Sequence, residues 1–475
     1  MACDASRPLY SVDQIRAIEA HTAATLAPHT LMQRAGLSLA RLVMALAPHA
    51  RTVWIACGPG NNGGDGFEAA VHLKAWGKNV QISHLARTEY AQDASKSIAK
   101  SRAAGVPIGN TVPAEFDVAV DALFGIGLQR ALGDEHAQWV QAMHASGKPI
   151  VAVDCPSGLD TDSGQAMPTA VRATATLTFM GLKPGLFTGQ GRDACGDIWL
   201  DALGADTALP PTAELNPAPR PLQRLHASHK GSYGDVAVVG GMEGMLGAAL
   251  LAARAALHSG AGRVYVAALD PQAPRLDPLQ PELMFRPVQG LVWQQLTVVA
   301  GCGGGERIAA QLPALLQDSA HLVLDADALN ALAADPGLQD ALRARASQRT
   351  AAATVLTPHP LEAARLLGTN TAQVQAQRLQ ATQTLADSLQ ATVVLKGSGT
   401  VIAAPGATPR INPTGNARLA TGGTGDVLAG MVGAHLAAGL PAFEAACAAV
   451  YRHGLAAQRE AGSSVLPASE LLKQS

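Results

Sequence analysis

Three acidic segments in the first half of the chain carry the residue types of a cation or substrate site. The sequence GPGNNGGDG occupies residues 58–66, and the segments DALFGIG and DCPSGLD begin at Asp121 and Asp154. Each segment follows an apolar run typical of a buried strand, and ligands of parallel sheets bind at the carboxyl ends of the strands. Carboxylate, amide and hydroxyl oxygens suit a monovalent or alkaline-earth cation rather than zinc. We therefore expect the three segments to converge on one functional site.

The glycines of the first segment also permit a different interpretation. Gly58, Gly60 and Gly63 fit the G-x-G-x-x-G pattern of dinucleotide-binding turns. An ordinary nicotinamide-binding unit would place an acid at the end of its second strand, for the ribose hydroxyls. Here the expected second strand ends in residues 83–85 (SHL), and the next acid is Glu89. The pattern therefore disfavours a dehydrogenase, and a tight turn whose Asn and Asp tolerate left-handed geometry is the structural alternative.

A glycine-rich stretch in the second half has the character of an anion site. The sequence TGGTGD, residues 421–426, stands at the head of an apolar helical run. Backbone N–H groups at a helix N-terminus attract anions, so this turn suits charge that develops on a transferring phosphoryl group. Asp426 would repel phosphate but makes sense as a base toward a substrate hydroxyl. The alternative is an acid that the helix dipole favours.

Other residues of this half fit phosphoryl chemistry as a set. Lys396 ends an expected strand and leads into GSGT, where an ammonium group and backbone amides can meet nucleotide phosphates. Asp325 and Asp327 follow a strand and can organise Mg²⁺, although capping of a helix is an equal interpretation. His359 stands where a strand meets a helix, where a lone histidine is more often structural.

Two parallel sheets, each with helices on both faces, would position these residues. Short apolar strands alternate with helices along both halves, which indicates an α/β fold with two three-layer domains. The expected strands of the first half are 51–57, 79–85, 116–124, 148–155, 174–179 and 196–203, and the expected helices are an N-terminal one capped by Ser11 and Gln14, then 67–76, 90–104 and 135–146. In the second half we expect strands within 229–241 and at 263–269, 296–302 and 321–327, a helix at 361–367 and a hairpin at 391–405.

A proline-rich segment separates the two halves. Residues 204–222 carry five prolines within twelve positions and no apolar period. Because proline locks φ and removes a donor, this segment indicates an extended linker. We expect domains at residues 1–208 and 223–475, joined by a linker at 209–222.

Composition limits the classes of function. The 475 residues are 48% hydrophobic and 15% charged, with a formal net charge of −2. This balance predicts a globular protein without the excess of basic residues that is typical of nucleic-acid binding. Six cysteines without a C-x-x-C pair argue against a zinc site or a disulfide framework and fit a reducing cytosol. With no signal peptide and no spanning segment visible, we expect a cytoplasmic protein with no membrane partner.

The first half resembles a known family. NNGGDG, DALFGIG and DCPSGLD, in this order and at these strand ends, look like the NAD(P)H-hydrate epimerase domain (the YjeF N-terminal family), which has a Rossmann-like sheet. The resemblance covers roughly residues 10–205 and implies K⁺ binding by Asn62, Asp121 and Ser157, and contact of the catalytic Asp154 with the substrate near its reacting ring. The residues implied to hold the hydrated dinucleotide are Asn61, Asn62, Gly63, Gly64, Asp65, Gly125, Ile126, Gly127, Leu128, Gln129, Arg130 and Ala131. Lys183 is a weaker catalytic candidate, for which an ordinary surface lysine is the alternative.

The second half is similar to the ADP-dependent NAD(P)H-hydrate dehydratase family, which has a ribokinase-like fold. The motifs KGSYG, LLAARAALHSGAG, DADALN, LTPHP, KGSGTVI and ATGGTGDVLAG carry this resemblance over about residues 225–470. It implies nucleotide contacts at Lys396, Gly397, Ser398, Gly399, Thr400 and Gly425. It implies contacts with the hydrated cofactor at Ala248, His359, the catalytic Asp426 and either Gly303 or Gly305. The chain departs from the family in reading GCGGG for the usual GPGLG and HPLE for HPGE, so the glycine contact stays open.

Together the halves resemble bifunctional NAD(P)H-hydrate repair enzymes. The family resemblance implies that one domain interconverts the R and S hydrates, while the other phosphorylates the S hydroxyl and expels phosphate to restore NADH or NADPH. The implied partners are NADH hydrate, NADPH hydrate, ADP and AMP, with K⁺ in the epimerase domain and ADP as phosphoryl donor with Mg²⁺ in the dehydratase domain. We also expect a homo-oligomer. The alternative is a small-molecule kinase of the ribokinase-like class fused to a non-catalytic Rossmann-like binding module.

Overall fold

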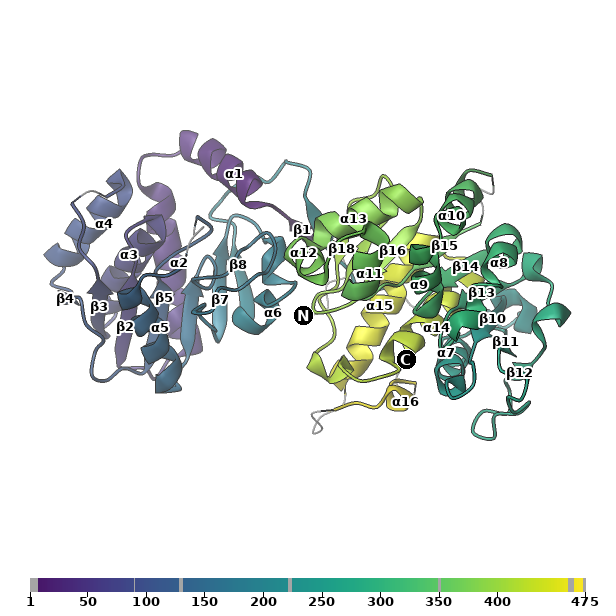
Figure 1. The fold of residues 1–475 in the computed structure, drawn as a ribbon. Coiled ribbons are helices and arrows are strands. Elements are labelled where there is room, and N and C mark those ends of the chain that lie inside the picture. The colour runs from purple at the N-terminus through teal and green to yellow at the C-terminus, as the bar shows by residue number, and fades with distance from the viewer. Residues whose placement is uncertain are drawn as a thin grey trace. The chain divides into compact units, whose positions relative to one another are not determined.

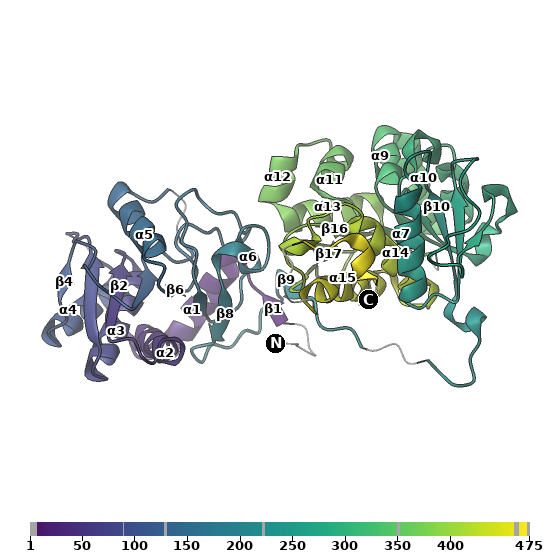
Figure 2. The ribbon, with the colours of Figure 1, turned by 90° about the horizontal axis from the view of Figure 1, so that it is seen from below.

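The computed structural model describes residues 7–88, 90–127, 131–220, 224–348, 352–459 and 465–472. The chain divides into two compact units, one of Pro8–Ala213 and the other of Glu214–Ser475 together with Arg7. This division falls inside the proline-rich segment, and each unit has its own sheet (Figure 1 and Figure 2). Among the described residues, no helix is long and apolar enough to cross a membrane.

The first unit is built on a fully parallel sheet. Its strands lie in the order β4-β3-β2-β5-β6-β7-β8. The strand bounds are β2 Thr52–Cys57, β3 Asn79–His84, β4 Ile108–Gly109, β5 Val118–Ala122, β6 Ile150–Val153, β7 Ala175–Phe179 and β8 Asp197–Asp201. The helices are α1 Val12–Ala24, α2 Thr30–Leu46, α3 Asn61–Ala75, α4 Gln92–Ala103, α5 Asp134–Ser146 and α6 Gly191–Ala194. Strand β1, Arg7–Leu9, precedes them at the division between the units.

Alternate residues of the central strand fill two separate cores. Val53 and Ile55 of β2 pack in the core that also takes side chains from α1, α2, α3 and α4. Trp54, between them, packs on the other face of the sheet with Trp139 and Met143 of α5. The sheet is thus covered on both faces, which explains why its strands are continuous apolar runs rather than alternating ones.

The predicted loop at residues 58–66 is wrong in part, because α3 begins at Asn61 and not near residue 67. The glycines of this segment have low helix propensity, so propensity does not predict that the helix begins here. A Cβ on Gly63 would lie 2.0 Å from the carbonyl oxygen of Gly58, and one on Gly66 would lie 2.7 Å from Cβ of Ala122. Only glycines therefore let the first turns of α3 rest directly on the ends of the strands. Helix α2 was also missed.

The second unit carries a longer, mostly parallel sheet. From β9 onward its order is β9-β18-β17-β16-β15-β14-β13-β10-β11-β12, with antiparallel pairing where β17 meets β16 and β18. The strand bounds are β9 Ala213–Leu215, β10 Asp235–Gly240, β11 Arg263–Ala268, β12 Met284–Phe285, β13 Thr297–Ala300, β14 His321–Leu324, β15 Thr354–Leu356, β16 Thr392–Leu395, β17 Val401–Ala403 and β18 Arg410–Ile411. The helices are α7 Leu246–His258, α8 Leu312–Asp318, α9 Asp327–Ala334, α10 Pro336–Gln348, α11 Pro360–Leu367, α12 Thr371–Ala376, α13 Arg378–Leu389, α14 Thr424–Ala437, α15 Ala442–Arg459 and α16 Ala468–Leu471. Alanine-rich faces of α7, α14 and α15 pack into one core with the strands.

Two local expectations have different outcomes here. The hairpin expected at 391–405 is confirmed as β16 and β17. The proline-rich segment, expected to be linker alone, contains β9, whose Glu214 and Leu215 pair with Arg410 and Ile411 of β18. Its extended backbone suits a strand, so part of the segment joins the second unit's sheet.

Candidate active sites

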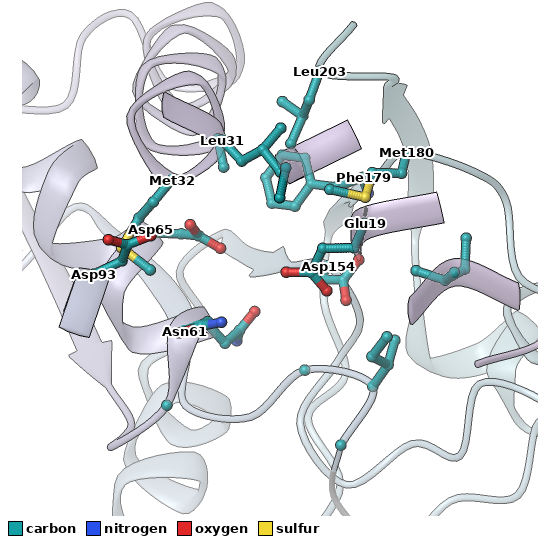
Figure 3. A pocket seen from close by; sticks show the side chains of 18 of the residues that line it. Glu19, Leu31, Met32, Asn61, Asp65, Asp93, Asp154, Phe179, Met180 and Leu203 are labelled. Atoms are coloured by element: carbon teal, nitrogen blue, oxygen red, sulfur yellow. Dashed lines mark hydrogen bonds between the residues drawn. The ribbon is translucent and has the colours of Figure 1, made fainter. Parts of the chain in front are cut away.

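A cavity of about 510 Å³ opens in the first unit, at the carboxyl ends of the central strands. Its walls come from α1, α2, the start of α3 and the loops after β5, β6 and β7 (Figure 3). Four acidic side chains line it: Glu19, Asp65, Asp93 and Asp154. The aromatic and aliphatic side chains of Phe179, Met180 and Leu203 form an apolar wall. The cavity can therefore take a ligand with an apolar ring and groups that exchange protons.

Asp154 is the most tightly positioned of these acids. Lys183, which is fully buried, donates to its Oδ1 at 2.5 Å and also to Oγ1 of Thr178 and the carbonyl oxygen of Phe179. Asp154 itself has a φ of 63°, a strained conformation for a residue with a side chain. The interpretation of Lys183 as a surface lysine is wrong. It is the buried partner of the acid that reaches the cavity.

The other two central acids have raised pKa values. Burial raises the pKa of Glu19, and the nearby Asp154 raises it further. Burial likewise raises the pKa of Asp65 well above its usual value, with Asp154 and Glu19 adding to the effect. Acids with raised pKa values that share one cavity are typical of acid–base sites.

A second group of oxygen atoms lies beneath the cavity. Oγ of Ser157 donates to Oδ1 of Asp121 at 2.6 Å, and the amides of Ser157 and Leu123 donate to the same carboxylate. Asp121 is fully buried, and this burial raises its pKa to about 6 despite the hydrogen bonds. Asn62 lines the cavity above, and its buried Nδ2 has no partner within the part of the chain that is described. The structure therefore brings Asp121 and Ser157 together and leaves the Asn62 amide unsatisfied.

The structure places the predicted substrate residues of this unit in two groups. Those that line the cavity are Asn61, Asn62, Asp65, Gly125, Ile126, Gly127 and Asp154. Gly63 and Gly64 are buried in α3 instead, against Gly58 and Met32, where they permit close packing. Ala131 is exposed, and Leu128, Gln129 and Arg130 lie outside the described residues. Sequence reasoning missed Glu19, although it stands among the buried positions Ile15, Ile18 and Thr22 of α1.

The second unit gathers its acids around Lys396. Nζ of Lys396 donates to Oδ1 of Asp325 at 2.6 Å, and the Thr357 hydroxyl donates to the same oxygen at 2.8 Å. Asp327 accepts from the amide of Gly305 at 2.8 Å. Neither aspartate side chain caps α9, so the capping interpretation is wrong.

Asp426 stands in the first turn of α14, next to this group. It offers a carboxylate oxygen within 4.8 Å of ligand atoms of Cys302 and Asp325. Burial raises the pKa of Asp426 to about 6, and the negative charge of Asp325 contributes to this. Gly423 begins the helix with a φ of 88°, and a Cβ on Gly425 would come within 3.2 Å of Nζ of Lys396. The Asp426 carboxylate, the Lys396 ammonium group and the helix N-terminus therefore meet at one place.

Glycines shape the two turns that flank this group. Gly303 and Gly305 both have positive φ, and a Cβ on Gly303 would lie 3.1 Å from Cβ of Ala248. The turn of residues 396–400 is braced by Arg378, which is only 2% exposed and donates to the carbonyl oxygens of Leu395, Lys396 and Gly399. Sequence reasoning missed Arg378, because nothing local distinguishes it from a surface arginine.

His359 has a structural role in this arrangement. Its Nδ1 accepts from the amides of Leu361 and Glu362 at the start of α11, and the Glu362 carboxylate accepts from the amide of His359. Nε2 of His359 lies 3.3 Å from Glu362, and burial lowers the histidine pKa while raising that of Glu362 to about 7. Contact of His359 with a substrate stays a prediction.

Comparison with known proteins accounts for both units. The profile of the family described as NAD(P)H-hydrate dehydratase matches residues 236–474, and that of the YjeF-related protein N-terminus matches residues 28–185. The bifunctional NAD(P)H-hydrate repair enzyme Nnr of Escherichia coli is 36% identical, over 90% of this chain and 84% of its own. The chain belongs to the bifunctional NAD(P)H-hydrate repair enzyme family.

Further members of the repair enzyme family and one solved structure extend this comparison. The Nnr protein of Coxiella burnetii is 36% identical over 98% of this chain and 97% of its own. A crystal structure of ADP/ATP-dependent NAD(P)H-hydrate dehydratase from Bacillus subtilis, co-crystallised with ATP and Mg²⁺, is 32% identical. It covers 53% of this chain and 90% of that chain, with a TM-score of 0.45. The family expected from the motifs and the α/β fold class are confirmed.

Proposed function

We propose that this chain repairs hydrated nicotinamide cofactors with two activities. The first unit epimerises the R and S forms of NADH hydrate and NADPH hydrate. The second dehydrates the S form to NADH or NADPH with a nucleotide as phosphoryl donor. The observation that carries this proposal is the position of Asp426, a base with a pKa of about 6 at the glycine-rich start of α14 and beside Lys396. Membership of the repair enzyme family supports the same assignment.

In the second unit, the hydrate carries a hydroxyl at C6, and Asp426 takes the proton of that hydroxyl. The hydroxyl oxygen then attacks the terminal phosphorus of the nucleotide, the bond from that phosphorus to the bridging oxygen breaks, and the rest of the nucleotide (AMP when the donor is ADP) leaves. The negative charge that develops on the transferred group meets the amides around Gly425 and the ammonium of Lys396. Phosphate next leaves C6 with its bonding electron pair and takes up a proton from C5, so the ring double bond returns. Phosphorylation helps because phosphate is a far better leaving group than hydroxide.

We propose ADP, accompanied by Mg²⁺, as the nucleotide at residues 396–400 and Gly425. A nucleotide phosphate can bind the amides of a glycine-rich turn. Arg378 stabilises that turn by donating to the carbonyl oxygens of Lys396 and Gly399. Mg²⁺ is commonly held by one or two carboxylates plus substrate phosphates. The carboxylates proposed for this role are Asp325, which accepts from Lys396, and Asp327, which accepts from the amide of Gly305. When bound, the metal neutralises charge on the phosphates.

In the first unit, we propose that K⁺ binds to Asn62, Asp121 and Ser157. Oxygen atoms of a carboxylate and a hydroxyl lie within hydrogen-bonding distance of each other there, and the Asn62 amide nearby lacks a partner in the described part of the chain. The O and N atoms of an amide side chain are assigned from hydrogen bonding, so a rotated Asn62 amide would supply oxygen instead of nitrogen. A cation would also neutralise the buried Asp121 carboxylate.

Two substitutions in the intact chain test the proposed function. Asp426→Asn keeps the size of the side chain but removes the base, so dehydration of pure S hydrate with ADP should fall by roughly 10²–10⁴-fold while epimerisation stays near wild type. Asp154→Asn should do the reverse, so that pure R hydrate persists while S hydrate is dehydrated at the normal rate. Reduced-nicotinamide absorbance follows dehydration, and chromatography of the two epimers follows epimerisation.

Thermal unfolding of each variant is the folding control for the substituted unit, and the retained activity of the other unit shows that the rest of the chain is intact. Full dehydration by Asp426→Asn, or loss of both activities from one substitution in a folded protein, contradicts the two-site function. A stable phosphorylated product in place of released phosphate and NADH would instead support the alternative of a small-molecule kinase.

A further inference from the structure

Glu19 occupies a place on α1 where an acid is not expected. The buried face of this helix is formed by Ile15, Ile18 and Thr22, and Glu19 lies on the same face at the helical spacing of three and four residues. Its carboxyl group lines the cavity together with Asp154, and Figure 3 shows both side chains pointing into the same part of it. Among the described residues, Glu19 makes no hydrogen bond and no ion pair. Its position is therefore not explained by folding.

The two acids differ in how their charge is compensated. Asp154 forms an ion pair with the fully buried Lys183 at 2.5 Å, so its charge has a partner. Glu19 has no such partner: burial and the Asp154 charge raise its pKa, and the weaker opposing influences come from Lys183 and from Arg16 on its own helix. Across the cavity stands Asp65 of α3, whose pKa is raised even further. The cavity thus holds one carboxylate with a buried cationic partner next to one carboxyl group whose pKa is raised.

We propose that Glu19 is a catalytic residue of the first unit, the general acid that acts together with Asp154 as general base in epimerisation. The inference rests on the function proposed above and adds to it the second proton-transfer group. In the hydrate, the hydroxyl at C6 and the ring nitrogen N1 share one carbon. Opening such a ring needs a base at the oxygen and an acid at the nitrogen, which are neighbouring atoms of one substrate.

The step balances without any other reactant. Asp154 takes the hydroxyl proton, the O–H electron pair forms the C6=O bond, and the C6–N1 bond breaks with its electrons on N1. Glu19 gives its proton to N1. Rotation about the C5–C6 bond then presents the other face of the aldehyde. In the reverse sequence N1 attacks C6, Glu19 recovers its proton from N1, and Asp154 returns its proton to the oxygen. The result is the other epimer with both side chains restored.

Glu19→Gln in the full-length chain tests this role. The R-to-S interconversion should fall by roughly 10²–10⁴-fold, the usual contribution of a general acid, with little change in KM. The pH profile should change as well. In the wild type the rate should decline on the alkaline side as Glu19 loses its proton, and that decline should vanish in Glu19→Gln. Glu19→Asp keeps a carboxyl group and should retain the decline at a reduced rate.

Glu115→Gln is the matched control, because Glu115 is an exposed glutamate of the same unit and its loss should leave rate and profile unchanged. Thermal unfolding of the first unit reports whether each variant is folded, because dehydration by the second unit does not depend on the fold of the first. A wild-type rate and profile in Glu19→Gln overturns the proposal, as does loss of the alkaline decline in Asp65→Asn but not in Glu19→Gln. A wild-type chain that dehydrates S hydrate but never interconverts the epimers overturns the epimerase function and this role together.

Discussion

In its ionised form, above about pH 6, Asp426 should lower the free energy of unfolding of the second unit. Its folded pKa of about 6 lies above the usual value of 3.8, so the stabilising contribution of this group is present below about pH 3.8 and is lost as pH rises through 6. Asp426→Asn should therefore raise the free energy of unfolding of the second unit by about 1–3 kcal/mol near pH 8 and by much less near pH 4. Denaturant unfolding at the two pH values measures this, and an equal effect at both would contradict it.

Asp121 should make the first unit respond to K⁺. A cation that binds only the folded state raises its thermal midpoint, so wild-type protein should unfold at a higher temperature in KCl than in LiCl. Asp121→Asn removes the charge of the fully buried carboxylate and should abolish the difference, together with the K⁺ dependence of epimerisation. Asp134→Asn, at an exposed position on α5 of the same unit, is the control that should keep both. A K⁺ response that survives in Asp121→Asn would contradict K⁺ binding at Asp121.

Sequence predicts chemistry at single residues better than it predicts their surroundings. Asp121, Asp154 and Asp426 stand out because each lies at or directly after the end of an apolar strand or at the start of an apolar helix. Folding alone does not call for an acid at such a position. Glu19 and Arg378 do not stand out, because their neighbours in the sequence are ordinary helix residues. Their importance comes from a cavity and from a turn that lie on other elements, which a local pattern does not contain.

At the scale of elements, the start of α3 depends on glycine. Gly63→Ala would place a Cβ 2.0 Å from the Gly58 carbonyl oxygen, and backbone cannot yield as a side chain can. We expect it to lower the free energy of unfolding by about 1–3 kcal/mol and to reduce epimerisation, because Asn62 and Asp65 move with the helix. Gly60→Ala is the matched comparison for stability, since nothing lies within 4 Å of the added Cβ and φ is −98°. Equal stability of the two variants, by thermal unfolding, would contradict this packing argument.

The strands were predictable from the sequence, and so was the start of α1, where Ser11 and Gln14 form the expected capping box, but the starts of α2 and α3 were not. Buried parallel strands are short apolar runs, so β2, β3, β5, β6, β7 and β8 lie within the expected ranges. Helix α3 begins with NNGGDG, whose residues have weak helix propensity, so tertiary packing decides its start. Helix α2 follows closely after α1, and Pro28 in the turn at residues 25–29 marks the break between them, a signal that the expected elements left out.

At the scale of the whole molecule, the position of β9 decides where the chain can be divided. We predict that residues 1–212 and 213–475 each fold alone and keep epimerisation and dehydration, respectively, because each unit has its own sheet and core. A fragment of residues 220–475 lacks β9 and Asn216, whose Nδ2 donates to Oδ1 of Asn412 at 3.1 Å and to the carbonyl oxygen of Cys447 at 2.9 Å.

The shorter fragment should therefore be less stable than residues 213–475 by roughly 2 kcal/mol, since each lost hydrogen bond is worth about 1 kcal/mol and leaves a buried group without a partner. Urea unfolding of the two fragments measures the difference, and Asn216→Ala in the longer fragment should reproduce part of it. Equal stability would show that β9 belongs to a linker rather than to the sheet. Insoluble fragments, with one cooperative transition for the intact chain, would show that the two units fold only together.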